Sequence, residues 1–251
     1  MFSSEIVKRF ESLSTPFYYY DLSTLENNLI SLTNCLADYN KVHFSVKSNT
    51  NTKILNLIKG YGLGIDAVSS NEIKHCIDLG YDGKDIVFAG VGKSDKEIEY
   101  AIKENISYFN VESLQELEVI NTISKKLSKI ANVSIRINPN IKTDTHKKIQ
   151  TGSSDDKFGI DLNDISHIPE YGKLENIRIT GIHFHIGSQL LNLKPFNDLC
   201  KISNDILNYF RENDLKIKNI NVGGGLGINY VDPENNLLSN FEQFISLFNN
   251  K

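Results

Sequence analysis

The stretch VHFSVKSN, residues 42–49, predicts a β-strand that ends in a lysine. Apolar side chains alternate at Val42, Phe44 and Val46, so they would share one face of the strand, and Lys47 follows at its carboxyl end. Parallel α/β folds gather their chemistry at that end of the strands. An amine shielded from water there favours its uncharged form and can attack a carbonyl compound. A solvated or ion-paired lysine is the alternative interpretation of the same stretch.

The rest of the chain repeats such strands and alternates them with helices. The further predicted strands are GIDAV (64–68), DIVFAG (85–90), SYFNV (107–111), VSIRINP (133–139), ITGIHFHIG (179–187) and INVGGG (220–225). Three strands lead into a Ser-x-x-Glu capping box that opens an amphipathic helix, at Ser69–Glu72, Ser94–Glu97 and Ser113–Glu116. This alternation predicts parallel βα units. We therefore expect an α/β fold, a TIM (β/α)8-type barrel of which seven units are recognisable.

The N-terminal segment precedes this repeat. Residues 4–13 predict a short amphipathic helix, and residues 15–21 predict an aromatic-rich strand behind a proline. The sequence STLE at residues 23–26 matches a capping box and predicts a helix that runs to about Tyr39. We therefore expect the barrel domain to begin with this helix, at residue 23.

Two later segments complete the predicted organisation. The polar stretch 141–160 is too long for an ordinary connection and predicts a functional loop. Residues 237–249 predict the helix after the seventh strand, so the eighth strand would lie beyond the chain. We divide the chain into an N-terminal helix and strand, residues 1–22, and a barrel domain, residues 23–251, incomplete at its C-terminal end.

Composition excludes several classes of function. The chain has 251 residues, 40% of them hydrophobic, and a formal net charge of -4, which offers no electrostatic footprint for nucleic acid or an anionic membrane. Three scattered cysteines indicate neither a disulfide framework nor a zinc site. The N-terminus lacks the apolar core of a signal peptide, and no later run has the length of a membrane span. We expect a cytoplasmic protein.

Two motifs at later strand ends bear on ligand binding. NVGGGLG (221–227) is either a flexible turn or a cradle in which backbone N–H groups converge on a phosphate. In HFHIGSQ (183–189) the strand alternation sends His183 and His185 to one face. These are either satisfied core histidines or an imidazole that lies against a planar cofactor, with Ser188 available to a phosphate.

Two charged residues inside predicted strands require partners. Arg136 alternates with apolar neighbours and should meet an anion or another acceptor, either in a structural ion pair or at a cofactor. Asp66 in GIDAV poses the same question. Glu72 is interpreted as a capping residue. We predict no metal site, because the His-x-His at His183 and His185 lacks a third ligand at a recognisable spacing.

A series of longer motifs runs through the whole chain. In order, they are SVKSN, GIDAVSSNE, FAGVGKS, NVES, RINPN, THKKIQTG with KFGI, GIHFHIGSQ and VGGGLGINY. Together they closely resemble diaminopimelate decarboxylase, a fold-type III pyridoxal-phosphate-dependent decarboxylase with an alanine racemase-like barrel. Small departures are Ser48, where the family usually has alanine, and Ser70-Asn71 in place of glycines.

The resemblance implies a cofactor, pyridoxal 5'-phosphate, and a set of residues that hold it. Lys47 would be the catalytic residue and carry the cofactor covalently, and His185 would stack on its pyridine ring. The remaining contacts would come from Asp66 and Arg136 along the pocket and, at the phosphate, from Ser188, Gly223, Gly224 and Gly225.

The resemblance also implies an activity, the decarboxylation of meso-2,6-diaminopimelate to L-lysine as the last step of lysine biosynthesis, by a homodimer. Alternatives are a related decarboxylase of ornithine, arginine or carboxynorspermidine, a non-catalytic pyridoxal-phosphate-binding barrel, and a Schiff-base aldolase. The family's E-P-G-R segment, C-E-S/D motif, substrate-side tyrosine and C-terminal β domain would all follow residue 251. The strand at 15–21 would join that β domain, and we expect the 251-residue chain alone to be inactive.

Overall fold

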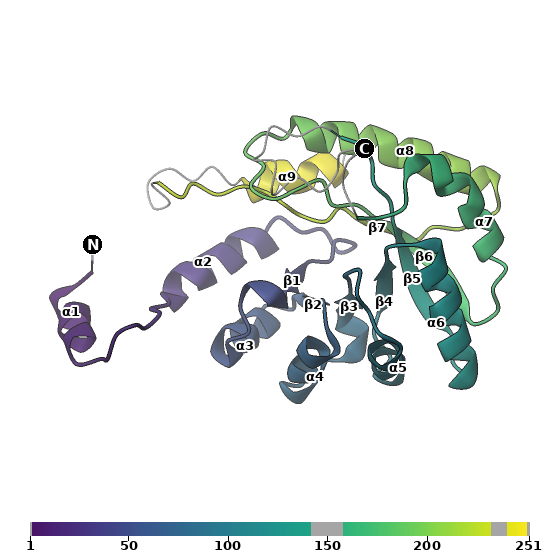
Figure 1. The fold of residues 1–251 in the computed structure, drawn as a ribbon. Helices are drawn as coiled ribbons and strands as arrows, with labels where there is room; N and C mark the ends of the chain where they lie inside the picture. Colours follow the sequence, from purple (N-terminus) through teal and green to yellow (C-terminus); the bar gives the residue numbers. More distant parts are fainter. Residues whose placement is uncertain (1, 142–157, 232–239, 250–251) are drawn as a thin grey trace.

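Seven parallel strands form one sheet in the computed structural model, which describes residues 2–141, 158–231 and 240–249. The strands are β1 (His43–Ser45), β2 (Gly64–Ala67), β3 (Ile86–Phe88), β4 (Tyr108–Val111), β5 (Ala131–Arg136), β6 (Ile177–His183) and β7 (Asn219–Asn221). Their order in the sheet equals their order in the chain. Figure 1 shows the sheet curled, with helices around its outer side. The predicted α/β barrel-type fold is confirmed as a seven-stranded open barrel.

Helices connect and cover the strands. They are α1 (Ser4–Glu11), α2 (Leu22–Thr33), α3 (Thr52–Gly60), α4 (Ser70–Asp78), α5 (Asp95–Lys103), α6 (Leu114–Lys126), α7 (Ile168–Tyr171), α8 (Lys194–Glu212) and α9 (Phe241–Asn249). Short 3-10 turns lie at η1 (Val46–Ser48), η2 (Gly83–Asp85) and η3 (Leu162–His167). None of the described helices is both long enough and apolar enough to cross a bilayer.

The three predicted Ser-x-x-Glu boxes begin α4, α5 and α6. Two of their glutamates, Glu72 and Glu116, also fix the strand ends that precede the helices. For example, Ser69 Oγ accepts a hydrogen bond from the Glu72 N–H at 3.2 Å, while the Glu72 carboxylate accepts one from the Val68 N–H at 2.8 Å. The equivalent carboxylate in the first turn of α6, that of Glu116, accepts from the Glu112 N–H, which follows β4. A local capping signal therefore also sets the geometry of the carboxyl edge of the sheet.

The two faces of the sheet differ in polarity. On β5, Val133 and Ile135 are fully buried in the apolar core that the strands share with the surrounding helices. Ser134 and Arg136 alternate with them and face the other way. The register places Arg136 beside His183 on β6. The inner face therefore carries buried polar groups towards the carboxyl ends of the strands.

Several predicted boundaries were wrong. The helix predicted from residues 23–26 begins one residue earlier, because Asp21 Oδ1 accepts from the N–H groups of Ser23 and Thr24, and it ends at Thr33. Glu26 does not fold back as a cap, since its carboxylate accepts the Tyr61 hydroxyl at 2.9 Å. Residues 15–21 pair with none of the seven strands.

The ends of the chain differ in how they attach to the barrel. Figure 1 shows α1 standing apart from the sheet, with the segment 15–21 leading from it to α2. Around α1 the aromatic rings pack on one another, for instance Phe10 on Tyr19 with centroids 5.3 Å apart. At the other end, α9 confirms the predicted final helix and contacts α2. In the segment between α2 and β1, Asn40 Nδ2 donates to Asn249 Oδ1 at 2.9 Å. Most of the predicted functional loop, residues 142–157, lies outside the described residues.

Candidate active site

Lys47 lies just beyond β1, in the turn η1, rather than on the strand itself. Its side chain is exposed and, within the described residues, forms no hydrogen bond or ion pair. Of the two interpretations of this stretch, the structure therefore shows the solvated lysine, because within the described residues β1 pairs with β2 alone and lies at the side of the sheet. The ammonium group still interacts electrostatically with Asp66 and His185, so Lys47 faces the same region as both.

Asp66 lies on β2 next to this lysine. Its Oδ2 accepts a hydrogen bond from the Ser45 hydroxyl at 2.7 Å, between residues that face each other across the β1–β2 ladder. Burial raises the pKa of the Asp66 carboxyl. The Ser45 hydrogen bond and the positive charges of Lys47, Arg136 and Lys93 oppose that shift. Asp66 is thus an acidic group on which three cations act at the carboxyl edge of the sheet.

Lys93, in the turn after β3, is a second lysine at this edge and was not singled out in the sequence. Its side chain is only 1% exposed, and its three protons are all donated. The acceptors are the carbonyl oxygens of Gly90 and Asn110, at 2.6 and 2.8 Å, and Glu116 Oε1 at 2.7 Å. A lysine so bound cannot act as a nucleophile, which leaves Lys47 as the accessible amine. The signal in the sequence was a lysine directly before the capping serine of a helix.

Arg136 ends β5 and is held by an acid that sequence reasoning also missed. Its Nη1 donates to Glu112 Oε1 at 2.7 Å, and both side chains are buried. The guanidinium lies over the ring of Phe158, 5.0 Å from the centroid. The predicted partner of Arg136 is therefore present within the chain as an ion pair. The signal for Glu112 was an acid placed between the end of a strand and its capping serine.

His183 and His185 differ in their surroundings. His183 is buried at the end of β6, and burial together with the Arg136 charge lowers its pKa well below the usual value. His185 lies beyond the strand, where its Nδ1 is 3.0 Å from the Gly223 carbonyl oxygen. Burial and Arg136 lower its pKa to about 4, so its ring is neutral at pH 7 and the Nδ1 proton is donated to that carbonyl. Only His185 is thus tied to the glycine segment.

The three glycines after β7 all have left-handed backbone, with φ of 77° at Gly223, 75° at Gly224 and 95° at Gly225. A Cβ at Gly223 or Gly225 would meet a carbonyl oxygen of the segment after β6 at 2.1 or 2.0 Å. A Cβ at Gly224 would meet nothing within 4 Å. The outer two glycines therefore permit close packing, and the middle one borders open space.

The segments after β6 and β7 are joined to each other. The Leu190 N–H donates to the Gly225 carbonyl at 2.9 Å, and the Gly227 N–H donates to the Leu190 carbonyl at 2.9 Å. Within the second segment, the Asn221 side chain accepts from the Gly223 N–H at 2.9 Å. Within the described residues the N–H groups of Gly224 and Gly225 have no acceptor. Ser188 is exposed in the same double segment. Free N–H groups beside open space suit a small anion such as a phosphate.

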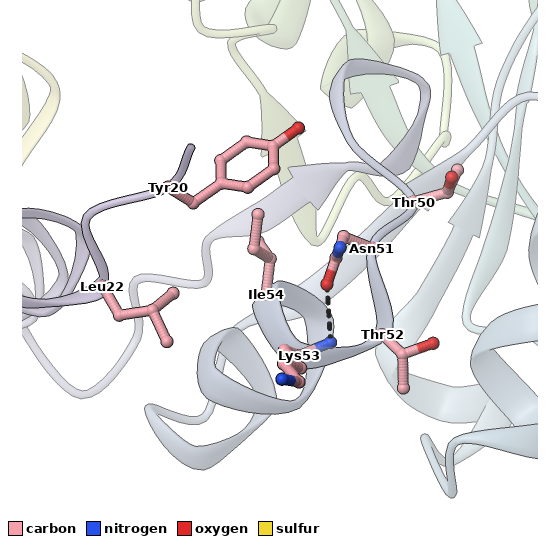
Figure 2. Close-up of a pocket in the computed structure, with 7 residues that line it drawn as sticks. All are labelled: Tyr20, Leu22, Thr50, Asn51, Thr52, Lys53 and Ile54. Carbon is pink, nitrogen blue, oxygen red and sulfur yellow. Dashed lines mark hydrogen bonds between the residues drawn. The ribbon is translucent and has the colours of Figure 1, made fainter. Parts of the chain in front are cut away.

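Two shallow pockets lie beside this edge rather than over it. The larger, of about 650 Å³, is lined by Tyr20 and Leu22 from the N-terminal segment and by residues 50–54 at the start of α3. Figure 2 shows Tyr20 and Ile54 facing each other across it. The second, of about 270 Å³, includes Ser48 and Asn49, directly after Lys47. Neither is lined by Asp66, His185 or the glycines, so the convergence of polar groups identifies the candidate site better than these hollows do.

The described residues thus bring together an accessible amine, a partly buried acid, a neutral imidazole and a glycine segment at the carboxyl edge of the sheet. A planar, anionic carbonyl cofactor fits this donor set, since each feature has a counterpart in it. Among the described residues, no group of three His, Cys, Asp or Glu side chains could hold a metal ion.

Comparison with known proteins agrees with this donor set. Residues 22–251 match the family model described as "Pyridoxal-dependent decarboxylase, pyridoxal binding domain". A diaminopimelate decarboxylase from Bacteroides thetaiotaomicron is 40% identical over 245 residues, which are 96% of this chain and 64% of that protein. A relative of the same name from Haemophilus influenzae is 38% identical over 88% of this chain and 54% of its own length.

A solved structure gives the same result at the level of the fold. The crystal structure of diaminopimelate decarboxylase from Helicobacter pylori complexed with L-lysine superposes with a TM-score of 0.89 and 34% identity. It covers 98% of this chain, which spans 62% of that protein. The chain thus spans between half and two thirds of the length of these relatives. Because the family model matches most of its length, the chain belongs to the family of pyridoxal-binding domains of the pyridoxal-dependent decarboxylases.

Proposed function

We propose that the protein to which this chain belongs decarboxylates meso-2,6-diaminopimelate to L-lysine, the last step of lysine biosynthesis, with pyridoxal 5'-phosphate as cofactor. The observation that carries the proposal is the 40% identity over 96% of the chain to a protein named for this reaction. The site supports it independently, because the accessible Lys47 and the glycine segment 223–225 meet the needs of a phosphorylated aldehyde.

The chain's own residues divide the binding of this cofactor among them. Lys47 would bind the carbonyl carbon of the cofactor, and because its side chain is exposed, its Nζ is accessible to that carbon. Gly224, whose flank is open, and the exposed Ser188 would hold the phosphate with the N–H groups of the glycine segment. His185 would lie against the ring, kept neutral by burial and oriented by its bond to Gly223.

When bound, the cofactor supplies the electron sink that accepts the electron pair left by departing carbon dioxide. The chain contributes position and electrostatics. Arg136 and Lys47 are cations near Asp66, so they favour its ionised form while burial opposes it. Because His185 is neutral, it adds no further positive charge beside Lys47. A charged imidazolium there would repel the Lys47 ammonium group. The site thereby keeps the accessible amine of Lys47 next to the Asp66 carboxyl and an uncharged ring.

The other parts of the proposal concern the whole protein. We infer that the active form is a homodimer in the cytoplasm, as the resemblance to the decarboxylase family implies, and that residues supplied from outside this chain complete the site. A decarboxylase of ornithine, arginine or carboxynorspermidine is the alternative, and the names of the relatives favour diaminopimelate.

The test uses the protein in its natural full length. The purified protein is loaded with pyridoxal 5'-phosphate, reduced with borohydride and mapped by peptide mass to find the labelled lysine. Carbon dioxide release is then measured from meso-diaminopimelate, ornithine and arginine. We expect the label on Lys47 and release from meso-diaminopimelate. A label without release from any amino acid would instead indicate a cofactor-binding protein that is not a decarboxylase.

A further inference from the structure

Glu112, the acid that binds Arg136, is a buried carboxylate beside a helix cap to which its side chain does not contribute. It follows β4 directly, and its side chain is only 5% exposed. The helix that follows is capped by Ser113, whose hydroxyl accepts the Glu116 N–H at 3.2 Å, so α6 does not need the Glu112 side chain. A buried carboxylate is costly unless it is paired, so this one requires a specific use.

Both oxygens of Glu112 are used, and by different parts of the chain. Oε1 accepts from Arg136 Nη1 at 2.7 Å, and Oε2 accepts from the Gly159 N–H at 3.0 Å. Gly159 has φ of 82°, and a Cβ there would lie 3.1 Å from the Arg136 carbonyl oxygen. The preceding Phe158 places its ring under the guanidinium. Glu112 therefore fixes Arg136 from one side and fixes the segment that covers Arg136 from the other.

We infer that Glu112 is a positioning residue for the cofactor site: it sets the place of the Arg136 guanidinium by binding it and by holding Phe158-Gly159 against it. The inference rests on the proposed function, because the resemblance to the decarboxylase family implies that Arg136 lines the pocket of the proposed cofactor. Arg136 is the group whose charge reaches Asp66, His183 and His185, so a displaced guanidinium changes the electrostatics of the whole edge.

The chain offers a matched control in Glu116. It is a second partly buried carboxylate of the same cap, and both of its oxygens are also used. Oε1 accepts from Lys93 Nζ at 2.7 Å and Oε2 from the Glu112 N–H at 2.8 Å. Lys93 donates all three of its protons to the protein, so the cation that Glu116 holds has no donor left for a ligand. Glu112 instead holds the Arg136 guanidinium, whose charge acts on Asp66, His183 and His185.

The substitutions Glu112→Gln and Glu116→Gln are equivalent in chemistry. A carboxamide has one acceptor oxygen and one NH2 donor group. Either variant therefore keeps one of the two hydrogen bonds of the carboxylate, and at the other position its NH2 group faces another donor. Both should lower the unfolding temperature of the cofactor-free protein. If Glu112 positions Arg136, only Glu112→Gln should also weaken the binding of pyridoxal 5'-phosphate, by roughly ten-fold, the scale of one charge-assisted hydrogen bond.

The measurement is the dissociation constant of pyridoxal 5'-phosphate, by titration of the natural full-length protein and each variant at a temperature where all are folded. A ten-fold rise for Glu112→Gln with less than about a two-fold rise for Glu116→Gln supports the inference. Equal dissociation constants for the two variants overturn it and make Glu112 a stabilising residue only. Should Glu112→Gln fail to fold, Glu112→Asp keeps the charge and withdraws it by one methylene, and an unchanged constant for that variant overturns the inference as well. A wild-type protein that does not bind the cofactor would instead overturn the proposed function, and this inference with it.

Discussion

Substitutions in the glycine segment should separate ligand binding from folding. We predict that Gly224→Ala weakens the binding of pyridoxal 5'-phosphate while the protein remains folded, whereas Gly223→Ala mainly destabilises it. The two glycines have nearly the same backbone, with φ of 75° and 77°. They differ in what an added methyl group would meet. At Gly224 it would meet no atom within 4 Å, whereas at Gly223 it would lie 2.1 Å from the Phe184 carbonyl oxygen.

The magnitudes follow from these two observations. A left-handed conformation costs an alanine roughly 1–2 kcal/mol relative to glycine, and this is the whole structural cost expected at Gly224. At Gly223 the clash with a backbone atom adds an overpacking cost of roughly 1–3 kcal/mol, because the neighbouring strand end must shift. At Gly224 the methyl group would occupy the open flank of the segment, and excluding one phosphate contact should lower affinity roughly ten-fold.

Two comparisons make the assay specific. Gly62 has φ of 75°, and a Cβ there would also meet nothing within 4 Å, but this glycine lies in the turn after α3, away from the glycine segment. Gly62→Ala should therefore cost the same stability in denaturant unfolding and leave cofactor affinity unchanged. Pyridoxal, which lacks the phosphate, should bind Gly224→Ala as it binds the wild type. The reasoning is refuted if Gly224→Ala keeps its affinity for pyridoxal 5'-phosphate, or if it loses affinity for pyridoxal to the same extent.

Three further predictions concern the charged groups. Lys47→Ala should abolish the borohydride-stable adduct and change the free energy of unfolding by less than about 0.5 kcal/mol, since the side chain is exposed; an adduct on another lysine would reject the assignment. Lys93→Met should retain the adduct but cost about 3–5 kcal/mol of stability, because it leaves the Glu116 carboxylate unpaired, and an unchanged denaturation midpoint would contradict the buried ion pair. His185 has a folded pKa of about 4 against an ordinary value of 6.5, so the unfolded chain binds more protons between these values and stability should fall as pH drops from 6.5 to 4, by about 3 kcal/mol at most from this group. His185→Asn should reduce that slope, and an identical pH profile for the variant would mean that His185 does not titrate in this window.

Much of the fold follows from local signals in the sequence. The Ser-x-x-Glu boxes act over three or four residues, so they could be recognised without knowing what the helix packs against. The alternating apolar runs identified all seven strands for the same reason. The errors occurred at boundaries and in the N-terminal segment. Asp21, and not the predicted Ser23, caps α2, and residues 15–21 pair with none of the seven strands.

For the candidate site as well, some features follow from local sequence and others from tertiary contacts. The sequence by itself determined which residue types stand at the strand ends, including Lys47, His185 and the glycines at 223–225, because each follows a strand directly. Only the tertiary structure decided their partners. Arg136 binds an acid 24 residues away, and His185 a carbonyl oxygen 38 residues away, through contacts that exist only once the sheet has curled. Whether a lysine is exposed like Lys47 or fully bound like Lys93 depends on such long-range neighbours, and a pattern of nearby residues contains no information about them.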